Sequence, residues 1–141
     1  MEAKLTPEEM RALFKREFPQ VDITGRDYAI ESFGAGTSRM RLIYGEKHLR
    51  PGGTISGPAM MTLADLALYV AILGGIGPVT LAVTTNLNVN FLRKPEKRDL
   101  IADCRMLKLG RRLAVGEVSI FSEGLAEPVA HATGTYSIPA V

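Results

Sequence analysis

The sequence predicts an α+β protein in which an antiparallel sheet wraps around one long, buried helix. One apolar segment of helical length lies near the middle of the chain, and strand-like segments separated by glycine-rich or charged turns lie on both sides of it. With 141 residues, 46% of them hydrophobic, the chain can form one substantial core but not two. We find no internal repeat or linker and expect a single domain over residues 1–141.

Residues 1–20 predict an amphipathic helix. Thr6 is a suitable N-cap, Pro7 suits the first helical position, and Pro19 ends the helix. One face of this segment is apolar and carries Met10, Leu13, Phe14 and Phe18. We expect the helix to pack on the rest of the domain through that face.

Six segments alternate in polarity as strands do. The first two are joined by a glycine-rich turn and form an expected hairpin. In the third, apolar residues alternate with threonine, alanine and asparagine, so we expect one face toward the core and one toward water or a partner subunit. The expected strands are 28–33, 38–44, 79–91, 100–109, 112–122 and 128–138.

The central helix is expected over residues 57–75. Ser56 is a plausible N-cap, Pro58 favours the first turn, and two consecutive glycines mark the end. Asp65 is the only charged residue of this helix, and Met61 and Tyr69 share its face.

A carboxylate in apolar surroundings is disfavoured unless it has partners or a function. Asp65 is therefore a candidate general base or nucleophile. A structural aspartate, satisfied by backbone amides or a tyrosine hydroxyl, fits the local pattern equally well.

Composition argues against several other classes of protein. The net charge of +2 does not favour nucleic-acid binding, and two histidines with one cysteine make no zinc-ligand pattern, so we expect no metal and no separate cofactor. The N-terminus lacks a secretory signal pattern, which favours a cytoplasmic protein. The one apolar stretch long enough for a membrane carries Asp65 near its centre, so we expect a core helix and no membrane association.

Four segments together resemble a known family. They are G-x-x-S-G-P before the central helix, "AMMTLADLALYVA" within it, "NVNFLRKP" and "LGRRLAVGEVSI". This pattern resembles the hotdog-fold acyl-CoA thioesterases of the phenylacetic-acid-degradation type, over about Arg39 to Ile138. The family form is N-x-x-G-x-x-H-G-G with an acid nine residues after the histidine, so Gly53 and Gly57 match the first two glycines and Asp65 the acid.

Three positions depart from the family form. Arg50 stands at the asparagine, Ser56 at the histidine and Pro58 at the last glycine. In the family, the asparagine and histidine help to position the water or the thioester carbonyl. Their replacement therefore bears on rate and substrate more than on fold.

The resemblance implies hydrolysis of an acyl-CoA thioester, with Asp65 as general base or nucleophile and the N–H of Gly57 as oxyanion donor. It also implies that Asp65 works across a dimer interface, against the partner's "AVTTNLN" strand, where Thr84 would orient the water. Thr85 is the second choice for that role, and an ordinary strand threonine is the alternative. For Ser56, an N-cap role competes with a catalytic contact.

Substrate contacts are expected from Arg50, Gly53 and Met61. Arg50 could hold an acyl carboxylate or a CoA phosphate. Arg111 and Arg112 match a basic turn of the family near the CoA nucleotide and, with the basic residues of 93–98, could form a positive rim, although solvated surface residues would look the same. We interpret His48 as a solvated loop residue, and His131 and Cys104 as packing residues in strands.

Two other functions remain open, and an oligomer is expected in each case. A non-catalytic acyl-CoA or acyl-carrier binding module would explain the changed asparagine and histidine positions. A hydratase or dehydratase is less favoured, because no histidine follows Asp65 until His131. An apolar central helix and exposed sheet edges favour a homodimer, or a dimer-of-dimers tetramer as is usual in the family.

Overall fold

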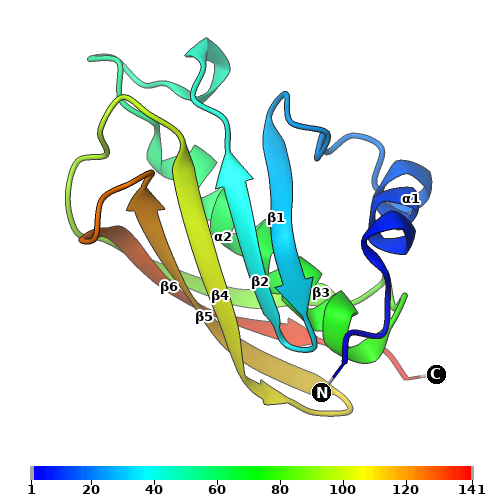
Figure 1. Ribbon diagram of the computed structural model, residues 1–141. Coiled ribbons are helices and arrows are strands. Elements are labelled where there is room, and N and C mark those ends of the chain that lie inside the picture. The colour runs from blue at the N-terminus through cyan, green and yellow to red at the C-terminus, as the bar shows by residue number, and fades with distance from the viewer. Residues whose placement is uncertain (1, 141) are drawn as a thin grey trace.

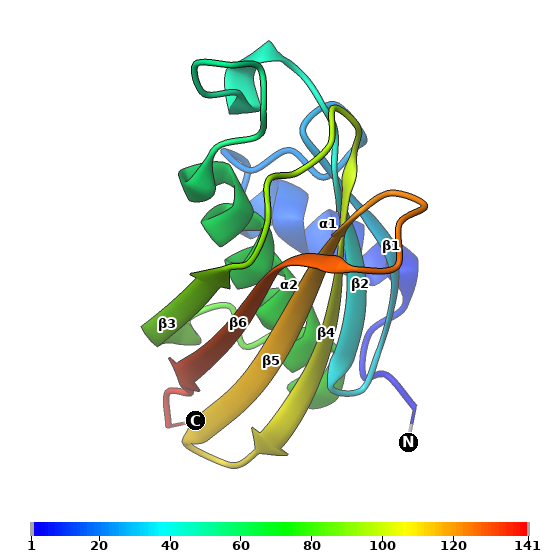
Figure 2. The same cartoon turned by 90° about the vertical axis from the view of Figure 1, so that its left-hand side faces the viewer.

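The computed structural model describes residues 2–140 and contains one six-stranded antiparallel sheet curled around a long helix (Figure 1). The strands lie in the order β1-β2-β4-β5-β6-β3. Figure 2 shows α2 in the hollow of the sheet, with α1 beside it. The predicted α+β hotdog fold with an extra N-terminal helix is confirmed. The elements are α1 (Pro7–Glu17), β1 (Tyr28–Gly34), β2 (Thr37–Leu42), the short 3-10 helix η1 (Glu46–His48), α2 (Gly57–Ile76), β3 (Val83–Phe91), β4 (Leu100–Leu109), β5 (Leu113–Ser122) and β6 (Pro128–Ser137).

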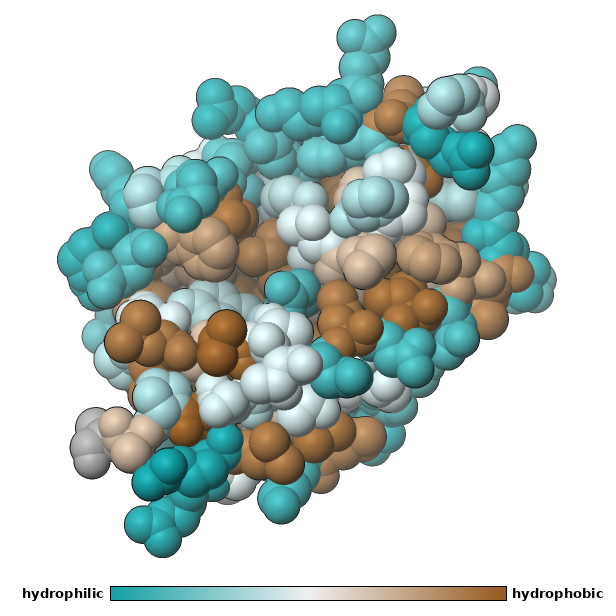
Figure 3. All heavy atoms as spheres, turned by 180° about the vertical axis from the view of Figure 1, so that it is seen from behind, coloured by the Kyte–Doolittle hydropathy of each residue, from teal (hydrophilic) through white to brown (hydrophobic). Residues whose placement is uncertain are grey.

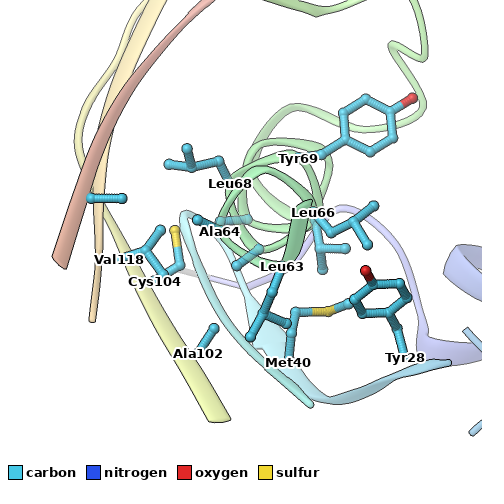
Figure 4. Packing of buried hydrophobic residues seen from close by; sticks show 14 of the residues in the cluster. Tyr28, Met40, Leu63, Ala64, Leu66, Leu68, Tyr69, Ala102, Cys104 and Val118 are labelled. Carbon is cyan, nitrogen blue, oxygen red and sulfur yellow. The ribbon is translucent and has the colours of Figure 1, made fainter. Parts of the chain in front are cut away.

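The central helix α2 begins where Ser56 predicts, but it runs through Gly74 and Gly75 to Ile76 and does not end at that glycine pair. The Ser56 hydroxyl accepts a hydrogen bond from the Ala59 N–H at 3.2 Å, which confirms the N-cap. The helix ends at Gly77, whose φ of +93° is readily available only to glycine. Figure 4 shows Leu68 of this helix directed toward the strands of the sheet and Tyr69 directed away from them.

By length and composition, α2 could also span a membrane, with a mean hydropathy of 1.8. In this fold, however, 72% of that apolar stretch is buried inside the protein itself. A helix that is enclosed by a sheet is apolar on nearly all sides, as a membrane-spanning helix is. In this fold α2 forms the centre of the hydrophobic core.

The N-terminal helix α1 begins at Pro7, directly after the predicted N-cap, ends at Glu17 and packs on α2. Thr6 and Glu9 form a reciprocal capping box at its start. Phe14 is buried, and its ring meets the Tyr69 ring of α2 edge to face, with centroids 5.8 Å apart. Phe18 follows the last helical residue and contacts Tyr69 in the same manner at 6.0 Å. This aromatic cluster fixes the C-terminal end of α1 beside α2.

The edge strand β3 differs from the strand predicted over 79–91. It begins at Val83, because the preceding residues form a turn in which the Ala82 N–H bonds to the Val79 carbonyl. A register shift between Thr84 and Asn86 then inserts one extra residue into its pairing with β6. As a result, Thr84 becomes half-buried while Val83 is 57% exposed, which reverses the predicted faces at the start of this strand.

Candidate active site

Asp65 is held by two hydroxyl groups from the end of the sheet. The Thr84 hydroxyl donates to Asp65 Oδ1 at 2.7 Å, and the Tyr136 hydroxyl donates to the same oxygen at 2.6 Å. The Tyr136 hydroxyl also lies 3.1 Å from the backbone carbonyl of Asp65. Residues 2–140 form no hydrogen bond to the second carboxylate oxygen, Oδ2. The carboxylate is therefore fixed through one oxygen only.

Tyr136 remains a hydrogen-bond donor at any ordinary pH. Its side chain is buried, and burial together with the adjacent Asp65 carboxylate raises the pKa of the phenol well above its usual value. A neutral phenol next to a carboxylate donates its proton in a short, charge-assisted hydrogen bond.

A cavity of about 540 Å³ opens beside Asp65. Its polar part contains Asp65, Thr84 and Tyr136, while its apolar part comes from the end of α1, one face of α2 and β3. Met61, which is 41% exposed, lies in its lining. The apolar lining consists of Phe18, Val21, Met61, Leu66, Tyr69, Ala82, Val83 and Leu87. Figure 3 views the molecule from behind, and apolar side chains gather around hollows on that face.

A second cavity, of about 700 Å³, lies at the N-terminus of α2. Gly57 lines it together with Phe91, Arg50, Arg93 and Lys94. Gly57 is the first residue of α2, so no earlier helical carbonyl accepts its N–H, and residues 2–140 provide no other acceptor for it. A Cβ at this position would lie 3.4 Å from the Phe91 ring, so a larger side chain would fill the space next to that N–H. The site therefore offers one backbone donor, the positive helix end and three basic side chains.

Two other predicted site residues have structural roles. Ser56 caps α2 through its hydroxyl and lines neither of these cavities. Gly53 has φ +81° in the turn before the helix, and its carbonyl accepts a hydrogen bond from the Tyr44 hydroxyl at 2.8 Å. Both residues shape the approach to Gly57, and Arg50 lines the cavity together with Pro51, Gly52 and Thr54 of the same turn.

The prediction of a solvated residue was wrong for His48, whereas His131 lies in a strand as predicted but is only half-buried. His48 is buried, 9% exposed, against the ring of Tyr28, and its backbone carbonyl accepts from the Ser56 N–H at 2.8 Å. The loop before α2 folds inward, a long-range arrangement that local sequence does not reveal. His131 lies on the outer face of β6, with Nε2 at 3.4 Å from a Glu117 carboxylate oxygen on β5. Cys104 is buried as predicted.

The expected basic rim does not form within one chain. Arg111 and Arg112 line a cavity at the Ile76 end of α2, whereas Arg93 and Lys94 lie at its Gly57 end. A helix of 20 residues is about 30 Å long, which separates the two groups.

The family resemblance set Asp65 against the Thr84 strand of a partner subunit. Within one chain, Thr84 already donates a hydrogen bond to Asp65. Sequence reasoning missed Tyr136, which lies directly opposite Thr84 in the pairing of β6 with β3. The only sequence signal was a single tyrosine in the last strand, on the face that points inward.

Comparison with known proteins agrees with this architecture. Residues 52–129, which include the Gly57 turn, α2 and the strands β3, β4 and β5, match the model of the thioesterase superfamily. A candidate esterase of Halobacterium salinarum is 34% identical over 114 residues, covering 75% of each chain. The crystal structure of a candidate thioesterase from Silicibacter is 48% identical, with a TM-score of 0.88 over 99% of this chain and 96% of that one.

Two more distant structures share the fold. One is a variant of the phenylacetic acid degradation protein PaaI from Thermus thermophilus, 24% identical, with a TM-score of 0.70 over 80% of this chain and 94% of that one. The other, a hypothetical thioesterase of Streptococcus pneumoniae crystallised with coenzyme A, is 20% identical, with a TM-score of 0.75 over 93% of this chain and 97% of that one.

The fold and the site define a hotdog-type hydrolase architecture. The chain belongs to the thioesterase superfamily. Hydrolysis of a thioester or ester bond is the activity that this membership and the names of its relatives indicate.

Proposed function

We propose that this protein hydrolyses an acyl-CoA thioester to a free acid and CoA, with Asp65 as general base or nucleophile. The observation that carries the proposal is the carboxylate itself, fixed by Thr84 and Tyr136 at the wall of a largely apolar cavity. An acyl chain suits the apolar part, and the reacting carbonyl would then lie beside the carboxylate. A structural aspartate would need no such cavity.

The chemistry requires few groups because a thiolate leaves readily. With Asp65 as base, the carboxylate takes a proton from water, and the resulting hydroxide forms a bond to the thioester carbonyl carbon. The tetrahedral intermediate then expels CoA as a thiolate when the C–S bond breaks, and the thiolate takes up the proton held by Asp65. With Asp65 as nucleophile, the carboxylate forms an anhydride and releases the thiolate, and water then cleaves the anhydride.

The oxyanion donor for this reaction has to come from a second copy of the chain. Gly57 and Asp65 are eight residues apart on one helix, which separates them by about 12 Å along its axis. One thioester carbon cannot lie within reach of both. The Gly57 N–H of one protomer would therefore serve Asp65 of its partner, and Pro58 has no N–H to add.

The exposed edge of β3 supports such a dimer. Val83 and Phe91, at its two ends, are 57% and 50% exposed, and an apolar edge strand of this kind favours pairing with another chain. Pairing two β3 strands about a twofold axis is antiparallel, so the Phe91 end of one strand meets the Val83 end of the other. The Gly57 cavity of one protomer then adjoins the Asp65 cavity of its partner. Two such dimers could associate through the asparagines on the outer face of β3.

The same dimer would bring the two separated groups of basic residues together around a bound CoA. Arg112 directly precedes β5, whose first residue, Leu113, pairs with Ser137, which in turn pairs with Val83. Arg112 therefore lies near the β3 end that faces the partner's Arg93 and Lys94. Such a cluster suits the phosphates of CoA.

Thiol release from a panel of short, medium, long and aromatic acyl-CoAs tests the proposal. Asp65→Asn should lower kcat by about 10²- to 10⁴-fold, the usual contribution of a general base. The protein's own thiol contributes little background, because burial raises the pKa of Cys104 to about 12. A folded Asp65→Asn variant with unchanged turnover would contradict the proposal.

A non-catalytic acyl-CoA binding module is the second candidate. It is favoured by one observation: Ser56, at the family's histidine position, uses its hydroxyl to cap α2. Tight acyl-CoA binding by the wild type, without turnover on any member of the panel, would select this function.

A further inference from the structure

We propose that Tyr136 is a positioning residue that, with Thr84, holds Oδ1 of Asp65 and leaves Oδ2 as the oxygen that acts on the thioester. This inference rests on the proposed hydrolysis. It assigns a role to a residue that the sequence did not single out, and it assigns different roles to the two carboxylate oxygens.

The register of the sheet places both donors. Thr84 and Tyr136 are direct cross-strand partners on β3 and β6, and both side chains reach Asp65 on the helix above them. Tyr136 is 3% exposed, with its ring 6.3 Å from that of Tyr69 in a near-parallel arrangement. Its hydroxyl also reaches the Asp65 backbone carbonyl, so the phenol is fixed at two points of the same residue. A side chain confined in this way has no freedom to follow a moving carboxylate.

The chemistry of the two oxygens then differs. Two donors on Oδ1 withdraw electron density from that oxygen and occupy its lone pairs. Oδ2 keeps its lone pairs available to take a proton from water or to form a bond to carbon. Because the carboxylate cannot rotate without breaking both hydrogen bonds, one defined oxygen is presented to the substrate.

Tyr136→Phe tests this role, since it removes only the hydroxyl. We expect kcat/KM to fall by about 10- to 100-fold, the kinetic equivalent of one hydrogen bond to a charged group. Tyr28→Phe is the matched control: Tyr28 is also a buried tyrosine, and it makes no contact with Asp65.

A readout independent of activity separates this inference from the proposed function. The ¹³Cγ resonance of Asp65, measured by NMR at one neutral pH, responds to hydrogen bonds at the carboxylate. Relative to the wild type, it should be displaced in Tyr136→Phe but not in Tyr28→Phe. An unchanged resonance in folded Tyr136→Phe would overturn the positioning role, whatever the activity. If the resonance moves but the wild type cleaves no acyl-CoA, the hydrogen bond stands, and the role in hydrolysis falls with the proposed function.

A second measurement covers the case in which Tyr136→Phe does not fold. Biosynthetic 3-fluorotyrosine preserves the size of the ring and makes the phenol a stronger donor. The Asp65 ¹³Cγ resonance should then be displaced from its wild-type position, and no displacement would contradict the inference. Of the four tyrosines in the chain, only Tyr136 donates a hydrogen bond to this carboxylate.

Discussion

Gly57 and Asp65 are held about 12 Å apart by the rigid helix that carries both. Each residue lines its own cavity, one with the basic residues and one with the apolar acyl-sized space. The helix thus separates the two functions that the reaction needs at a single carbon atom. This separation makes the oligomer part of the proposed chemistry.

Subunit mixing tests the composite site directly. Asp65→Asn and Gly57→Val each inactivate the protein if both groups are needed, the second because the added side chain fills the space against Phe91. When the two variants are co-expressed, heterodimers contain one intact site, so about a quarter of wild-type activity should return with random pairing. If each site belonged to one chain, no mixture would regain activity.

The edge of β3 is the expected interface. Val83→Asp places a charge where an apolar side chain would meet the partner, and we expect dimers to dissociate in sedimentation experiments and activity to fall with them. Leu125→Asp is the control, since Leu125 is 43% exposed but lies in the turn between β5 and β6. If the dimer persists in Val83→Asp but dissociates in Leu125→Asp, the interface does not lie at the edge of β3.

The start of β3 also illustrates what the sequence could not predict. Strict alternation over 79–91 predicted the strand and its amphipathic character, because both follow from local patterning. It placed Thr84 on the polar face, and one extra residue between Thr84 and Asn86 reverses that assignment. A bulge depends on pairing with β6, which lies more than 40 residues away in sequence, so local patterning carries no trace of it.

The roles of Tyr136 and His48 could not be predicted from the sequence for the same reason. The apolar helix and its lone Asp65 were visible in the sequence because an uncompensated charge in such a segment is unusual. The partner of that charge comes from the last strand, and the inward fold of the His48 loop depends on packing against Tyr28. Contacts of this kind are fixed only by the tertiary structure.

His48 is expected to make stability depend on pH. Burial lowers its pKa below the usual value near 6.5; the nearby Lys47 acts in the same direction, while Asp27 opposes it. The unfolded chain therefore binds a proton more readily than the folded chain. The stabilising contribution is complete above about pH 6.5 and is lost as the pH falls from there toward the lowered folded-state value.

Urea unfolding between pH 8 and pH 5 measures this effect. His48→Phe, which keeps an aromatic ring against Tyr28, should flatten the dependence of the unfolding free energy on pH within that window. His131→Gln is the matched control, because it removes the only other histidine, on the outer face of the sheet. An equal flattening in both variants would mean that burial of His48 is not the cause.

Phe18 is expected to limit the size of the acyl group. It lines the Asp65 cavity from the end of α1 and is braced edge to face against Tyr69. Phe18→Ala enlarges the apolar end of the cavity, so the ratio of kcat/KM for long over short acyl-CoAs should rise by roughly 10-fold. Phe121→Ala, a half-buried aromatic of β5 that does not line this cavity, should leave the ratio unchanged. If neither variant alters the ratio while both remain active, the acyl chain lies outside the α1 side of the cavity, and the specificity of the enzyme has to come from the Gly57 side.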